Sequence, residues 1–180
     1  MTEAGGAHRA ESDDIADVPK SVAVMFLKER VYATFTGLAI VLVVYTSTGH
    51  HSAAYAFEIL LLGVFAVVLA GFASDGIAHL AVHRTFPHGD DLRTLVRVAA
   101  SGLGTLLLPL GMITLAWLDV LKLNTALLIS GYIYIATLGL IGWLAVRRAD
   151  ITWWQKLAAL ITLVLIGLVV LSIQVLAHRH

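Results

Sequence analysis

Five long apolar runs are the feature of this 180-residue sequence that most restricts its fold. They cover roughly residues 31–47, 54–82, 97–118, 125–146 and 155–177. Each approaches or exceeds the length of about 20 residues that a helix needs to cross a bilayer. Hydrophobic residues make up 59% of the chain, more than a soluble domain of this size can bury. The sequence therefore predicts an all-α, polytopic membrane protein with five transmembrane helices.

The connections between these runs are short, covering residues 48–53, 83–96, 119–124 and 147–154. Short connections require neighbouring helices to run antiparallel and leave no room for a soluble domain. We therefore expect residues 31–177 to form one five-helix bundle, followed by a short tail at 178–180.

Lysine and arginine indicate the orientation of this bundle. Ten of the twelve lie in the N-terminal segment and in or directly beside the second and fourth connections, whereas the other side holds only Lys122 and Arg179. Because positive charge is retained in the cytoplasm during insertion, the N-terminus should be inside and the C-terminus outside. The expected location is the cell inner membrane, crossed several times.

The residues before the first run fall into two parts. Residues 1–18 are small, polar and acidic, which predicts a disordered tail without the basic start of a secretory signal. Residues 19–30 mix apolar and basic side chains and are too short to span, so they predict an amphipathic helix lying on the inner membrane surface. A gate or a partner-binding helix is the alternative for this segment.

Asp75, His79 and His83 follow one another at four-residue intervals near the end of the 54–82 run. On a helix they share one face, because each step of four turns only about 40° beyond a full revolution. Ionisable groups are costly at membrane depth and usually serve a function there. A carboxylate with imidazoles can bind divalent cations such as iron, manganese or zinc. Imidazole can also transfer protons near neutral pH.

Three interpretations of this motif stay open at the level of sequence. The histidines can lie among the inner headgroups with Asp75 paired to a neighbour, the motif can bind a metal, or it can relay protons. For a metal site, the candidate ligands are Asp75, His79, His83 and Glu58. A divalent metal ion bound by these ligands is the one candidate cofactor, and the sequence indicates no other.

A second polar set gathers on the outer side, where an external metal-collecting site is one interpretation and ordinary loop histidines are the other. Its members are His50, His51, Glu58, Asp119, His178 and His180. The chain has no cysteine, which excludes disulfides and thiolate ligands. No basic cluster alternates with aromatic residues, so a nucleic-acid partner is not expected.

Small residues in the 97–118 and 125–146 runs predict close helix packing. Pro109 should kink its helix near the middle of the membrane, because it removes a backbone donor. A broken helix that lines a transport site is the functional alternative.

The segments GFASDGIAHLAVHR (71–84) and SGLGTLLLPLGM (101–112) resemble two helices of the vacuolar iron transporter family. The resemblance covers about residues 20–177 and implies five spans, a dimer and divalent-cation exchange. It would place Asp75 at a methionine position of the family and His79 at a glutamate position. The chain lacks the family's aspartate in the first span, where Thr36 stands, and its Glu-rich insert between the second and third spans.

Three classes of function are compatible with this sequence. The first is a transporter of divalent metal cations or protons that uses the Asp75–His83 face, as a homo-oligomer with a dimer favoured. The second is a subunit or scaffold that assembles with other membrane proteins without transporting. The third, an intramembrane metallohydrolase, would need three protein ligands around zinc, and the other runs supply no buried acid or histidine for it. We expect a non-enzymatic protein whose partner is the lipid bilayer.

Overall fold

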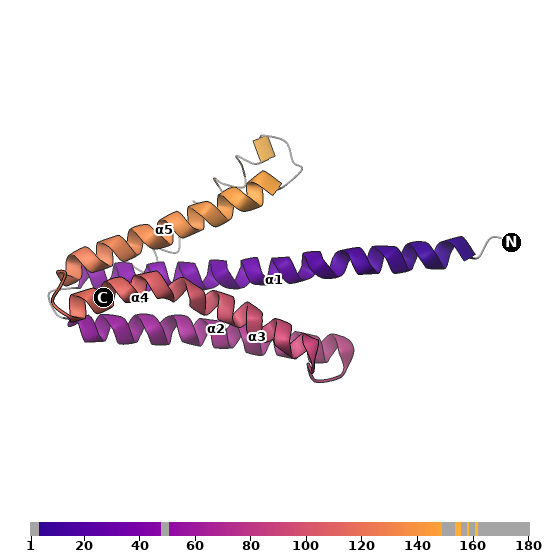
Figure 1. Ribbon diagram of the computed structural model, residues 1–180, viewed down its shortest axis with the longest axis horizontal. Coiled ribbons are helices and arrows are strands. Elements are labelled where there is room, and N and C mark those ends of the chain that lie inside the picture. Colours follow the sequence, from indigo (N-terminus) through magenta and orange to yellow (C-terminus); the bar gives the residue numbers. More distant parts are fainter. Residues whose placement is uncertain (1–3, 48–50, 149–153, 156–157, 159–160, 162–180) are drawn as a thin grey trace.

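The computed structural model describes residues 4–47, 51–148, 154–155, 158 and 161. Among them lie α1 (Ala4–Thr46), α2 (Ala53–His83), α3 (Asp90–Leu103), the 3-10 helix η2 (Gly104–Leu106), α4 (Leu107–Trp117) and α5 (Leu123–Arg148). The long helices lie side by side (Figure 1). The chain reverses direction between α1 and α2, between α2 and α3, and between α4 and α5, whereas α3 continues through η2 into α4. The predicted all-α class is confirmed for these residues, which contain no strand.

Three helical stretches in the described part of the chain are long and apolar enough to cross a membrane: Ala53–His83, Asp90–Trp117 and Leu123–Leu144. They contain the second, third and nearly all of the fourth predicted run. The first run, 31–47, lies almost wholly in the C-terminal part of α1, and the fifth, 155–177, falls almost entirely outside the described residues. The count of five spans and the in–out orientation stay predictions.

Large apolar side chains cover the outside of the bundle. In water they would form apolar patches far larger than a soluble monomer exposes, whereas a bilayer accommodates them without penalty. Examples on the three candidate spans are Leu62, Phe65, Leu69, Leu107, Leu108, Ile135 and Leu140. This surface supports the assignment of the chain to a membrane.

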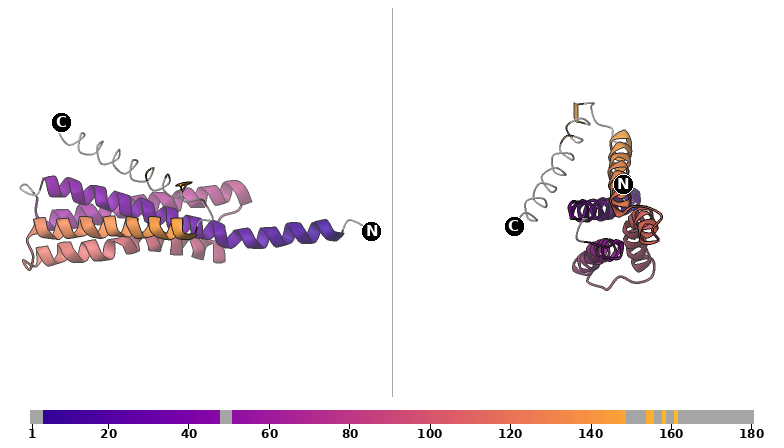
Figure 2. Two further views of the ribbon diagram at one scale, coloured as in Figure 1. Left: turned by 90° about the horizontal axis from the view of Figure 1, so that it is seen from above. Right: turned by 90° about the vertical axis from the view of Figure 1, so that its left-hand side faces the viewer.

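The first helix, α1, is a single element of 43 residues, about 65 Å long at the usual helical rise. Residues 4–18, 19–30 and 31–46 share this one helix. The disordered tail and the interfacial helix stay predictions. Pro19 removes only one backbone donor, so the helical hydrogen bonding continues past it. The N-terminal part of α1 projects beyond the other helices (Figures 1 and 2).

The core lies where α1 contacts α2, α3 and α5. The buried residues of α2 occur at intervals of four, at Ala56, Leu60, Val64 and Val68. This spacing forms one stripe that faces the bundle interior. The buried residues of α1 include Ala33, Gly37, Val41 and Val44, and the small residues among them allow close approach of the helices.

Tyr134 of α5 fills the space above Gly37 of α1. A Cβ atom at Gly37 would collide with the Tyr134 ring and hydroxyl, so glycine is required at this contact. The Tyr134 side chain is completely buried. This one aromatic ring therefore fixes the distance between α1 and α5.

The third candidate span is broken just before Pro109. Residues Gly104–Leu106 tighten into a 3-10 turn between α3 and α4, and Pro109 itself is buried in the first turn of α4. Proline supplies no N–H to the carbonyl four residues earlier, at Thr105, and its ring crowds that carbonyl. The predicted distortion is therefore present, centred three to five residues upstream of the proline.

The connection between α2 and α3 is shorter than expected, because α3 begins at Asp90 rather than near residue 97. Leu95, Val98 and Gly102 face the bundle. Asp90 and Asp91 lie in the first turn, where a negative charge is favourable. We call the end of the bundle that holds this connection the basic end, since Arg84, Arg93 and Arg97 lie near it.

Replacing Gly37 with alanine should destabilise the bundle by about 1–3 kcal/mol, because the new methyl group must displace the Tyr134 ring. Gly139→Ala on α5 is the matched control, since no atom lies within 4 Å of a Cβ placed there. Unfolding in detergent micelles, followed by circular dichroism, measures both. Equal stability of the two variants would contradict the packing described for Gly37.

Candidate functional site

Glu29 of α1 is the most unusual side chain in the described structure. It is only 1% exposed, and its Oε1 atom has no hydrogen-bond partner. It lies four residues before Ala33 and eight before Gly37, so it continues the buried face of α1 toward the basic end. An unpaired buried carboxyl group costs several kcal/mol if it is ionised, so this position is expensive.

Two glycines make room for the Glu29 side chain. A Cβ atom at Gly71 of α2 would lie 2.5 Å from Glu29 Oε2, and one at Gly102 of α3 would lie 3.1 Å from Glu29 Cγ. Any larger residue at Gly71 would overlap the carboxyl group. Helices α1, α2 and α3 thus form a pocket around one acid.

Lys28, the neighbour of Glu29, contacts α2 at Asp75, four residues beyond Gly71. Its Nζ atom donates a hydrogen bond of 2.8 Å to Asp75 Oδ1, and the Asp75 side chain is 13% exposed. Successive residues of a helix are rotated by about 100°, so Lys28 can reach Asp75 while Glu29 remains in the glycine pocket. The ion pair is partly open to solvent, because the Lys28 side chain is 37% exposed.

Lys28 and Glu29 lie before the first predicted span, and their surroundings change their pKa values. Burial raises the pKa of the Glu29 carboxyl group, and the negative charge of Asp75 raises it further, whereas Lys28 lowers it. The hydrogen bond to Asp75 raises the pKa of Lys28, although burial opposes this. Compared with an exposed glutamate, Glu29 thus holds its proton more strongly, and Lys28 likewise holds its proton more strongly than an exposed lysine.

An open recess of about 280 Å³ reaches Asp75 from the basic end. His79 and His83 line it with their rings 4.5 Å apart, and Met25 of α1 and Leu95 of α3 form other parts of its wall. His79 Nε2 lies 3.8 Å from Asp91 Oδ2, a distance that allows an ionic attraction when the imidazole is protonated but no hydrogen bond. Two imidazoles and the Asp75 carboxyl group thus border one open recess.

The structure brings together three of the four predicted metal ligands. Asp75, His79 and His83 border the same recess, but Glu58 is exposed on α2 about 25 Å away along the helix. Within the described ranges, no three His, Asp or Glu side chains are grouped closely enough to hold one metal ion. A divalent-metal site at this face stays a prediction.

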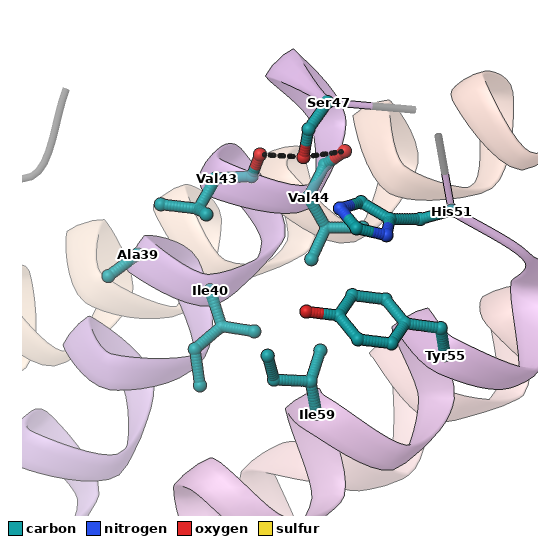
Figure 3. A pocket seen from close by; sticks show the side chains of 8 residues that line it. All are labelled: Ala39, Ile40, Val43, Val44, Ser47, His51, Tyr55 and Ile59. Atoms are coloured by element: carbon teal, nitrogen blue, oxygen red, sulfur yellow. Dashed lines mark hydrogen bonds between the residues drawn. The ribbon is translucent and has the colours of Figure 1, made fainter. Parts of the chain in front are cut away.

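At the opposite end, a recess of about 330 Å³ opens between α1 and α2 (Figure 3). His51 stacks on Tyr55 with ring centroids 4.2 Å apart, and the rest of the wall is mainly aliphatic. Ser47 donates its hydroxyl hydrogen within α1, with Val43 and Val44 carbonyl oxygens 2.9 and 3.4 Å away. Of the predicted outer histidines, His50, His178 and His180 lie outside the described residues.

Sequence reasoning missed Glu29, Lys28 and Tyr134. Glu29 and Lys28 were assigned to an interfacial helix, which concealed that Glu29 shares the i, i+4 register of Ala33 and Gly37. That register, combined with glycines in two other apolar runs, was the available signal. Tyr134 gave none, since an aromatic residue in an apolar run fits a lipid-facing position equally well.

No protein-family model, no curated protein and no solved structure matches this chain.

Replacing Gly71 with alanine should destabilise the protein by about 1–3 kcal/mol, since the methyl group would overlap Glu29 Oε2. The cost should largely disappear when Glu29 is also replaced by alanine, which removes the obstructing atoms. Gly76→Ala on the same helix meets no atom within 4 Å and should be neutral or slightly stabilising. Micellar unfolding of the four variants measures the coupling, and additive effects would refute the contact.

Proposed function

We propose that this membrane protein is a transporter that carries protons by means of the Glu29 and Asp75 carboxyl groups. The single observation that carries this proposal is the buried Glu29 carboxyl group with an unpartnered oxygen. Glutamine or leucine in the same place would avoid the cost of hiding an acid. A group that destabilises its own fold is expected where it serves an activity.

The recess at the basic end supports the proposal because it gives water a way to Asp75. His79 lines this recess, and an imidazole can both accept and release a proton, so it can pass protons inward. Asp75 acts electrostatically on Glu29 and is itself held by Lys28. Protonation of Asp75 would weaken the ion pair and ease deprotonation of Glu29, which links the two carboxyl groups in one cycle.

A proton is the ion that this arrangement suits best. One carboxyl group can bind and release a proton, whereas a divalent cation requires several ligands around a single point. The resemblance of residues 71–84 and 101–112 to vacuolar iron transporters extends the proposal to divalent cations. A dimer could then complete the ligand set with side chains from a second copy.

The alternative proposal is a subunit or scaffold that packs against other membrane proteins. Large exposed side chains such as Phe65 and Leu69 on α2 would serve such contacts. They serve contact with lipid equally well, so they favour neither function. A buried acid has no use in a packing role, and for this reason we place transport first.

Reconstitution in liposomes with a pH-sensitive dye inside tests the proposal. We expect Glu29→Gln to reduce proton flux by about a hundredfold or more, because an amide cannot release a proton at neutral pH. Asp75→Asn should reduce it by about tenfold and leave Lys28 without its partner. The matched control is Asp119→Asn, which changes an exposed acid at the opposite end and keeps a residue that tolerates the positive φ of 58° found there.

Wild-type flux in the Glu29 variant would overturn the transport role of this carboxyl group. If wild-type liposomes are no more permeable to protons or divalent ions than empty ones, the scaffold proposal takes its place. Native-membrane purification would then be expected to yield a stoichiometric protein partner.

Metal analysis of the detergent-purified protein separates proton transport from divalent-cation binding. On the proton proposal, the wild type and the variants Asp75→Asn, His79→Ala and His83→Ala should all contain less than one metal ion per chain. A stoichiometric metal ion that is lost in the Asp75 and His79 variants would instead favour the metal site. Glu58→Gln should have no effect in either case, since Glu58 lies far from the recess.

A further inference from the structure

The hydroxyl group of Tyr134 shares two properties with Glu29. Both side chains are essentially fully buried, and Tyr134 Oη and Glu29 Oε1 are buried side-chain atoms without a hydrogen-bond partner in the described structure. Phenylalanine would fill the same volume without burying an unsatisfied hydroxyl group. The hydroxyl at this position therefore calls for an explanation other than packing.

The position of the hydroxyl relates it to Glu29. Tyr134 reaches α1 at Gly37, eight residues beyond Glu29 on the same helix. Eight residues correspond to about 12 Å along the axis, which takes the hydroxyl toward the middle of the bundle. The two unpartnered groups thus lie along α1 at successive depths.

A third buried polar group lies between these two levels. Thr34 is completely buried, and its hydroxyl donates a 2.6 Å hydrogen bond to the Arg30 carbonyl oxygen. Its donor is occupied, but its oxygen retains the capacity to accept. Glu29, Thr34 and Tyr134 provide polar partners at three depths, and water needs such partners to enter an otherwise apolar interior.

We propose that the Tyr134 hydroxyl group is a proton-transfer group midway through the bundle, linked to Glu29 by water molecules beside Thr34. This step rests on the proton transport proposed above. The phenol oxygen accepts a proton from a water on the Glu29 side and releases its own proton to a water on the other side. The hydroxyl then rotates back, so Tyr134 is unchanged and one proton has moved outward along α1.

The test compares two tyrosines of α5 in the same liposome assay. Tyr134→Phe should slow proton flux by about tenfold to a hundredfold, because the proton must then pass between the water molecules on the two sides of position 134 without a protein hydroxyl group. Tyr132→Phe is the matched control, since Tyr132 is 69% exposed on the outer surface of the same helix. Its flux should equal that of the wild type.

Two further measurements distinguish proton transfer from a structural role. Tyr134→Phe should leave unfolding stability equal to or above that of the wild type, since the lost hydroxyl had no partner. The infrared carbonyl band of protonated Glu29, identified by its absence in Glu29→Gln, should persist in Tyr134→Phe. Loss of flux with both properties intact supports the proposal.

A second variant keeps the test valid if Tyr134→Phe does not fold. A fluorinated tyrosine at position 134 has nearly the same shape as tyrosine, and its phenol is more acidic. It should change the pH dependence of flux, whereas the same residue at position 132 should not. Unchanged flux in Tyr134→Phe, or an unchanged pH profile after fluorination, overturns the role of Tyr134. If Glu29→Gln still abolishes flux in that case, the proposed function stands without this step. If Glu29→Gln also has no effect, both proposals fail.

Discussion

The structure depends on how closely α1 can approach its neighbours. Its buried face carries small residues at Ala33 and Gly37, and α2, α3 and α5 all contact this helix. In a bilayer, helices gain little from hiding apolar surface from one another, so close van der Waals contact must hold them together. Where a large side chain enters this contact, as Glu29 and Tyr134 do, glycine on the facing helix makes space for it.

Much of the architecture could be predicted from hydropathy alone. The apolar runs of α2, α3–α4 and α5 match three helices able to span a membrane, because length and composition determine this property directly. The boundary near residue 30 could not be predicted, since a helix continues wherever the backbone permits and a change from polar to apolar residues does not end it. For the same reason α3 begins at Asp90, in the polar residues that precede the apolar run 97–118.

The candidate site was predicted only in part. Asp75, His79 and His83 share a recess, as their spacing on α2 indicated. Their partners come from α1 and α3, and a sequence pattern within one helix does not show which residues of other helices face it. Lys28, Glu29 and Gly102 belong to this second group. Glu58 shows that residue type alone does not identify a site. It is an acid on α2 like Asp75, but it is exposed and far from the recess.

The interrupted third span separates two tasks. Its first half, α3, carries Gly102 against Glu29, and its second half, α4, carries Pro109, whose carbonyl oxygen lies 3.4 Å from the donating hydroxyl of Ser130 on α5. Between them, the tightened turn at Gly104–Leu106 is where bending requires the least loss of regular hydrogen bonding. Because the span changes course at this turn, one membrane crossing can follow α1 over its first half and α5 over its second.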